Sequence, residues 1–324
     1  VHLMRTKGGG EPVRSGRASE RGECGDGPLF KWAKEQGIYA DKVTVAEFAF
    51  VADERQLAHE GKSGAGATGG DVVWSDRVRW RRGMMATRDI LRGEPLVVVP
   101  SHLVLSTENA ARSELAPVLE AFPNLTSHQT LALFLMQESN KGRASAWYPY
   151  VCSLPRSYDF SLWWSKERMR VETKGQSNST LAQRTEGTKR ALISQYNKLF
   201  PLLFRQFPGA YDKKSHSFRH WLWASSAVYS RNWGSPNKEL TRGNVMAPVA
   251  DMFNHHMGDR GTVKFLGEGW RGCFAGCRER FECDGSFVHG SKAHDKCLGD
   301  RCCDKCAHGQ AAAGGGGAFF AVIA

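Results

Sequence analysis

The sequence predicts an α+β fold in which a long helical block interrupts a small sheet. An apolar run of strand length lies at 96–99, before this block. Apolar residues recur at helical spacing over 192–207 and again over 218–231. With 324 residues, of which 41% are hydrophobic, the chain can bury a sizeable core. We therefore expect one main domain over 28–290, with a helical insert at about 105–232.

The first half of the chain is expected to combine a disordered N-terminus with short regular elements. Residues 1–27 are rich in Gly, Arg, Ser and Glu, which is typical of disorder. Residues 29–38 have apolar side chains at roughly helical spacing, and Gly37 is expected to end that helix. The apolar run 43–52 suits either a strand or a helix.

Residues 60–70 form a glycine-rich segment that imitates a dinucleotide-binding loop. Gly64, Gly66 and Gly69 match its G-x-G-x-x-G pattern. Such a loop must be followed by a helix, whereas the strand-like residues 72–74 follow here. We therefore expect a flexible inserted loop.

The helical insert is expected to begin with two helices, at 107–122 and 130–138. An aromatic connection that contains prolines follows at 147–155. Ahead of the insert, Gly83 indicates a tight turn or a close approach of the backbone to another group.

The residues at 245–256 place polar groups directly after an apolar run, in the order V-M-A-P-V-A-D-M-F-N-H-H. Polar groups that adjoin a buried run need partners, which a ligand could supply. The alternative is a core segment followed by a turn that Asp251 or Asn254 caps.

The charge of the chain, with 44 basic and 33 acidic residues, gives a net value of +11 and favours acidic partners in general. No block of five or six like charges occurs, so we interpret the charge as dispersed and do not expect a nucleic-acid partner. No apolar run reaches the length of about 18 residues that a membrane helix needs, so we expect no membrane association.

Four separated groups of residues stand in an order that matches one protein family. They include Ser230-Arg231-Asn232-Trp233 and the Met246–His256 motif just described. Together they resemble SET-domain lysine methyltransferases of the Rubisco large-subunit methyltransferase type. The matching segments are 82–90 with 93–100, 131–138 with 147–156, 223–233 and 246–256.

The resemblance implies a β-rich SET domain that uses S-adenosylmethionine to methylate a lysine of a protein substrate. It assigns the cofactor-binding role to three short groups of residues. These are Arg82, Gly83 and Met84; Ser230 and Arg231; and Asn254 and His255. Their chemistry suits this cofactor, because its carboxylate needs a cation and its polar ends need an amide, acceptors and close backbone approach.

The implied reaction is an in-line displacement in which a neutral lysine amine attacks the methyl group on sulfur. Lysine has an ordinary pKa of about 10.4, so it must lose a proton first. A narrow apolar channel and the nearby sulfonium would both lower this pKa. Alignment of the three reacting atoms would supply much of the remaining acceleration.

The chain departs from the family pattern after residue 256. Family members carry a tyrosine beside the transferred methyl group, but this sequence has no tyrosine after Tyr229, so the catalytic residue is unassigned. The family's C-terminal substrate-recognition domain is also expected to be absent. An inactive or truncated SET-like binding module is therefore the alternative to an enzyme.

The nine cysteines are unevenly distributed along the chain. Cys24 and Cys152 stand alone, and a secreted disulfide framework is not expected. The other seven lie between Cys273 and Cys306, where zinc binding competes with an unstructured tail. We expect residues 291–324 to lie outside the fold and assign no metal ligand.

Overall fold

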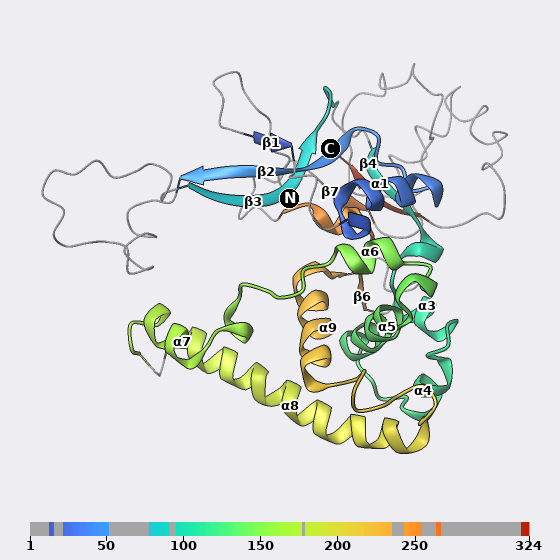
Figure 1. The fold of residues 1–324 in the computed structure, drawn as a ribbon, viewed down its shortest axis with the longest axis vertical. Coiled ribbons are helices and arrows are strands. Elements are labelled where there is room, and N and C mark those ends of the chain that lie inside the picture. The colour runs from blue at the N-terminus through green and yellow to red at the C-terminus, as the bar shows by residue number, and fades with distance from the viewer. Residues whose placement is uncertain are drawn as a thin grey trace, which may run out of the picture.

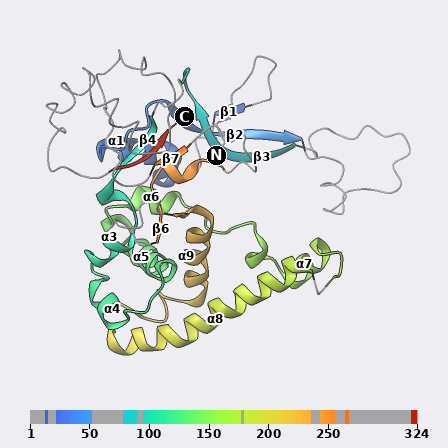
Figure 2. The same ribbon diagram turned by 180° about the vertical axis from the view of Figure 1, so that it is seen from behind.

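Most of the strands lie at one end of the molecule together with the first helix, and most of the other helices lie at the opposite end, as Figures 1 and 2 show from opposite sides. The computed structural model describes residues 13–15, 22–51, 78–90, 95–176, 179–234, 243–254, 264–266 and 319–323. Within these ranges most regular structure is helical, and strands are also present, so the α+β class is confirmed. Most of the helices lie in the expected insert at about 105–232.

Two three-stranded antiparallel sheets and one short strand pair form the β layer. The first sheet has the order β1 (Val13–Ser15), β2 (Val43–Val51), β3 (Val78–Ala86), and the second β4 (Pro95–Pro100), β8 (Phe319–Ile323), β7 (Lys264–Leu266). β5 (Trp233–Gly234) pairs with β6 (Asn244–Val245). In the first sheet Ala46 lies opposite Gly83, which fixes the register beside the candidate site.

Both ends of the chain contribute more structure than the sequence predicts. β1, the 3-10 turn η1 (Gly22–Cys24) and the start of α1 (Asp26–Glu35) lie in the N-terminal segment expected to be disordered. β8 lies in the tail expected to be outside the fold. Its F-F-A-V-I sequence has the aromatic and β-branched residues that favour strands, and β4 and β7 supply pairing edges.

Most of the α-helices in the described part of the insert begin at side-chain caps. The α-helices are α3 (Thr107–Ala111), α4 (Ala116–Ala121), α5 (Ser127–Lys141), α6 (Tyr148–Ser153), α7 (Lys166–Glu172), α8 (Thr180–Gln206) and α9 (Phe218–Arg231), and the 3-10 turns are η3 (Ser101–Leu103), η4 (Gly142–Ala144) and η5 (Ser161–Trp163). Thr126 and Gln129 form a reciprocal capping box at the start of α5. The hydroxyls of Ser179 and Ser217 accept hydrogen bonds in the first turns of α8 and α9.

The segment 107–122, expected to be one helix, divides into α3 and α4. Pro117 lies in the first turn of α4, where its missing N–H is harmless. In the interior of a continuous helix, the same proline would remove a hydrogen bond and clash with the preceding turn. Pro117 therefore favours a new helix start at this point.

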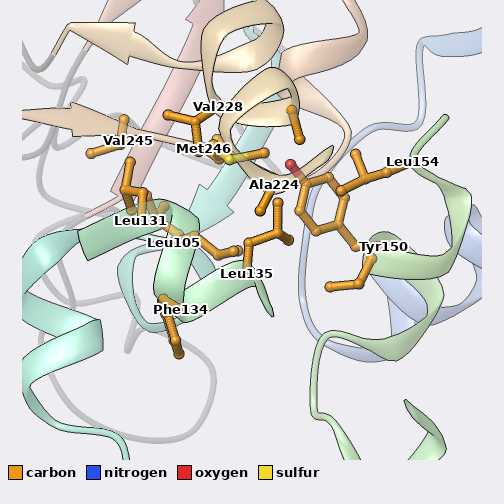
Figure 3. Packing of buried hydrophobic residues seen from close by; sticks show 14 of the residues in the cluster. Leu105, Leu131, Phe134, Leu135, Tyr150, Leu154, Ala224, Val228, Val245 and Met246 are labelled. Carbon is orange, nitrogen blue, oxygen red and sulfur yellow. The ribbon is translucent and has the colours of Figure 1, made fainter. Parts of the chain in front are cut away.

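Part of the core lies between α5, α6, α9 and β6, as Figure 3 shows. Side chains from these elements and from the residue after β6 meet there, and all of the following are completely or almost completely buried: Leu131, Phe134, Leu135, Tyr150, Ala224, Val228, Val245 and Met246. This packing fixes the end of α9 and the segment after β6, which carry the candidate site.

A disulfide between Cys24 and Cys152 joins η1 to α6 across 128 residues of sequence. The sequence pattern predicted no bond between these two cysteines. α1, which follows η1, also contacts the insert, because the Trp32 indole N–H donates to the carbonyl of Ala146 at 3.1 Å. The N-terminal segment is therefore anchored to the helical layer.

None of the helices in the described ranges combines the length and hydrophobicity that a bilayer crossing requires.

Candidate active site

The segment after β6 turns sharply and separates its polar side chains between the interior and the surface. Val249 adopts φ = 67° just before the 3-10 turn η6 (Ala250–Met252). A β-branched residue rarely occupies this left-handed region, so the surrounding core must hold it there. The turn buries Asp251 and leaves Asn254 exposed three residues later.

Asp251 is the centre of a buried polar network. Its carboxylate accepts a hydrogen bond from Nη1 of Arg231 at 3.0 Å and another, short one from the Tyr150 hydroxyl. The Asp251 side chain is 0% exposed and that of Arg231 13%. The network therefore ties together the end of α9, α6 and η6.

Burial dominates the ionisation of this network. It raises the pKa of Asp251, although Arg231 opposes the effect. Burial, followed by the charge of Asp251, raises the pKa of Tyr150 well above its ordinary value. Burial also disfavours the charged form of Arg231, but Asp251 and the neighbouring tyrosines outweigh it and raise that pKa. Each partner thus depends on the others in the interior.

A second tyrosine, Tyr158, borders the same network. Burial raises the pKa of Tyr158 to about 12, with Arg231 as the largest opposing influence. Its hydroxyl faces Ser230 and Arg231 but makes no hydrogen bond of normal geometry to any described residue. It is therefore a protonated, buried hydroxyl with capacity for a ligand.

Asn254 and Gly83 approach each other closely, as the glycine predicted. The Asn254 side-chain amide donates to the carbonyl oxygen of Arg82 at 3.0 Å. A Cβ atom placed on Gly83 would lie 2.4 Å from Nδ2 of Asn254, which no real structure tolerates without a shift. Only glycine leaves room for this amide beside β3.

The side chains of Arg82 and Met84, on either side of Gly83, have partners of their own in the protein. The guanidinium of Arg82 forms an ion pair with Asp26 of α1. The Met84 side chain is 1% exposed and lies in the core. Any contact of Met84 with a cofactor would therefore use its backbone, while Arg82 already offers its carbonyl to Asn254.

The remaining predicted site residues divide between the end of α9 and the undescribed part of the chain. Ser230 is exposed, and its hydroxyl donates to the carbonyl of Ala227 at 3.1 Å. Arg231 lies beside it and is held by Asp251. His255 lies outside the described residues.

The predicted roles outside this site remain untested. The glycine-rich segment 60–70 and the cysteines between 273 and 306 also lie outside the described residues. In the part of the chain that the structure describes, no three His, Cys, Asp or Glu side chains are grouped as metal ligands would be.

Sequence reasoning had not identified the roles of Tyr150, Tyr158 and Asp251. Tyr150 belongs to an aromatic motif and Asp251 to the polar motif, but nothing in their spacing shows that they meet. The sequence feature that could have indicated this network is the position of Asp251 directly after an apolar run. A carboxylate that is buried with such a run needs partners inside the protein.

Solved structures share this architecture. The SET domain of LSMT bound to lysine and AdoHcy aligns with a TM-score of 0.51 and 22% identity over 74% of this chain and 45% of that one. The complex with methyllysine and AdoHcy gives a TM-score of 0.52 at the same identity, covering 74% of this chain and 47% of the other. The chain has the SET-domain fold.

Sequence relatives of this SET domain include methyltransferases from plants and animals. Protein SET DOMAIN GROUP 40 of Arabidopsis thaliana is 28% identical over 181 residues, 54% of this chain and 34% of that protein. The chloroplastic [fructose-bisphosphate aldolase]-lysine N-methyltransferase of the same plant is 27% identical over 228 residues, 70% of this chain and 39% of that protein.

A relative with a different target residue is similar to the same degree. The actin-histidine N-methyltransferase of Mus musculus is 30% identical over 186 residues, 54% of this chain and 30% of that protein. The SET-domain chain thus spans about a third of the length of the curated relatives it matches. No family model matches the sequence.

Proposed function

We propose that this chain carries the cofactor site of an S-adenosylmethionine-dependent methyltransferase that modifies a lysine of a protein substrate. The observation that carries the proposal is the junction of Asn254 with Gly83, next to the buried pair of Arg231 and Asp251. This junction lies on a SET-domain fold.

The residues present fit such a cofactor. S-adenosylmethionine would supply an activated methyl group together with a carboxylate, an ammonium and an adenine. Asn254 offers an exposed amide with a free carbonyl oxygen, and Gly83 keeps the backbone of β3 open to close approach. Arg231 has donors besides the one that Asp251 uses, and a guanidinium suits a carboxylate.

The buried network would act by positioning these groups. Asp251 holds Arg231 at the end of α9, and Tyr150 holds Asp251. The Tyr158 hydroxyl stays protonated at neutral pH, so it would act as a hydrogen-bond donor. These groups are fixed before any ligand binds, which limits the reorganisation that binding requires.

Two experiments test the proposal. Titration calorimetry of the folded wild-type chain should show binding of S-adenosylmethionine, and its absence would overturn the cofactor assignment. Incubation with a radiolabelled methyl donor and peptide arrays should then label lysine peptides. Binding without any transfer would instead support the alternative of a non-catalytic SET-like binding module.

Histidine is the second candidate target, because the actin-histidine N-methyltransferase is 30% identical over 186 residues. Matched peptides that differ only by lysine or histidine at the central position distinguish the two. We expect label on the lysine peptides, and label confined to the histidine peptides would overturn the target assignment.

One further expectation remains a prediction. Nucleic acid is not expected to be a partner, and an RNA and DNA binding assay tests this.

A further inference from the structure

A second candidate binding site lies on the helical insert, between α7 and the first half of α8. A cavity of about 720 Å³ opens there, lined mostly by polar side chains. Figure 1 shows α7 beside the N-terminal end of α8, remote from α4. No residue of the candidate active site lines this cavity.

The lining is strongly basic. Lys166, Arg170, Lys189 and Arg190 contribute four positive charges, and Glu186 contributes one negative charge. Arg170 pairs with Glu167 at 2.9 Å. Among the described residues, no ion pair neutralises the other three cations. Lys189 donates a hydrogen bond to the carbonyl oxygen of Trp164 at 3.2 Å.

Apolar side chains are also exposed on these two helices. Val171 of α7 is 48% exposed, and Leu181 and Ile193 of α8 are 44% and 45% exposed. Ile193 follows Lys189 by four positions, so both lie on one face of α8. By the same helical periodicity, Val171 and Leu181 lie on other faces than the lining residues, so Ile193 supplies the apolar contact area beside the cations.

Two hydrogen bonds link the cavity, through η5, to the helix α9 that carries part of the candidate active site. The Thr185 hydroxyl of α8 donates to the Ser161 hydroxyl of η5 at 2.7 Å. Trp163, at the end of η5, donates its indole N–H to Ser226 of α9 at 2.8 Å. The last two residues of α9, Ser230 and Arg231, belong to the candidate active site. These bonds therefore fix the position of the cavity relative to that active site.

We propose that this cavity docks an acidic segment of the protein substrate, with an apolar residue of that segment resting on Ile193 of α8. This proposal rests on the proposed function, since it concerns how the same enzyme recognises its substrate. Charge complementarity supports it, because three lining cations have no ion pair among the described residues and face only one lining carboxylate, and such an excess attracts carboxylates and accelerates their encounter. No aromatic side chain lines the cavity to stack on bases, which favours a peptide over a single-stranded nucleic acid.

A matched pair of charge reversals tests the docking site. Lys166→Glu with Arg190→Glu changes two exposed lining residues, whereas Lys198→Glu with Arg205→Glu changes two exposed residues of α8 that do not line the cavity. Both double variants change the net charge equally. The probe is a fluorescein-labelled peptide of glutamates with one leucine, and its binding is followed by fluorescence anisotropy in the absence of a methyl donor.

We expect the wild type and the control variant to bind the peptide alike, and the cavity variant to bind it about tenfold more weakly or worse. The affinity should also fall with rising salt, because exposed charges are screened beyond about 10 Å at 0.1 M salt. Equal binding by the two variants, or no binding by the wild type, would overturn the proposal. Tighter binding of a single-stranded RNA that the cavity variant loses would also overturn it.

A second readout separates this proposal from the proposed function. Methyl transfer to a lysine peptide that carries the acidic segment should show a KM raised about tenfold in the cavity variant, with kcat unchanged. Calorimetric binding of S-adenosylmethionine should be the same in all three proteins. A cavity variant that lost cofactor binding, or whose kcat fell at unchanged KM, would contradict a docking role. Absence of cofactor binding by the wild type would sink the proposed function alone.

Discussion

The side-chain amide of Asn254 donates a hydrogen bond to the carbonyl oxygen of Arg82, 3.0 Å away and 172 residues earlier in the chain. This bond joins the turn after β6 to the middle of β3. The side-chain carbonyl oxygen of Asn254 takes no part in this bond. Gly83 lies beside the amide and contributes no side chain. A ligand bound at this junction would contact both segments at once.

Gly83→Ala should weaken S-adenosylmethionine binding by about tenfold or more, because the new Cβ would displace the Asn254 amide. Gly83 does not have a positive φ, so the chain should still fold. Titration calorimetry gives the affinity and thermal unfolding gives the stability. Gly234→Ala in β5 is the matched control, since its Cβ would meet nothing within 4 Å. Unchanged affinity in Gly83→Ala would argue against a cofactor at this junction.

Asp251→Asn should lower the free energy of unfolding by about 3–5 kcal/mol, because it leaves the buried charge of Arg231 without a counterion. Tyr150→Phe should cost less, about 1.5–3 kcal/mol, since it removes one hydrogen bond to a charged group but keeps the ring in the core. Urea unfolding measures both. Glu167→Gln, which breaks the exposed ion pair with Arg170, should change stability little. Equal losses in the buried and exposed variants would contradict the network described above.

The stability of the chain should decrease as the pH falls from about 6.5 to about 4, in part through His128. Burial lowers the pKa of His128 to about 4, and its ring packs on Tyr229 at 4.1 Å between centroids. Between these pH values the unfolded chain binds a proton that the folded chain does not, so stability is present above pH 6.5 and lost below it. The loss is at most about 3 kcal/mol.

His128→Phe retains an aromatic ring beside Tyr229 and should reduce this pH dependence. The comparison is made by urea unfolding at several pH values between 4 and 7. Burial also lowers the pKa of His216 and of His220, so part of the slope should remain. A slope that His128→Phe does not alter would show that this ring titrates alike in both states.

Loss of the disulfide should destabilise the chain by about 2–5 kcal/mol, because Cys24 and Cys152 close a long loop in the unfolded state. Urea unfolding with and without a dithiol reductant measures the difference. The double variant Cys24→Ser with Cys152→Ser should be as unstable as the reduced wild type and insensitive to the reductant. Complete alkylation of both thiols before any reduction would show that the bond does not form.

Local patterns predicted the elements that depend on a few neighbouring residues. The helix end predicted at Gly37 is confirmed, since α1 ends just before this residue, which adopts φ = 78°. The periodic stretch 218–231 is α9, and the apolar run 96–99 lies within β4. The run 43–52, whose pattern suited either a strand or a helix, contains β2. Pairing with β3 favours the strand over the helix.

Contacts between distant segments could not be read in the same way. The close approach at Gly83 was predicted, but its partner Asn254 was not. The bond between Cys24 and Cys152, like the meeting of Tyr150 with Asp251, depends on how separate elements pack. One sequence carries residue types and spacings, whereas these pairs are determined by the tertiary structure.

The bond between Cys24 and Cys152 encloses β2, β3, β4 and α3 to α5 in a covalent ring. A single tryptic cut inside this ring, for example after Lys62, would therefore leave both fragments attached to one another. On a gel without reductant the nicked chain would migrate close to its intact length, and it would separate into two bands only after reduction. Limited proteolysis scored on non-reducing gels alone would overlook every cleavage between these two cysteines, which are 128 residues apart in a chain of 324.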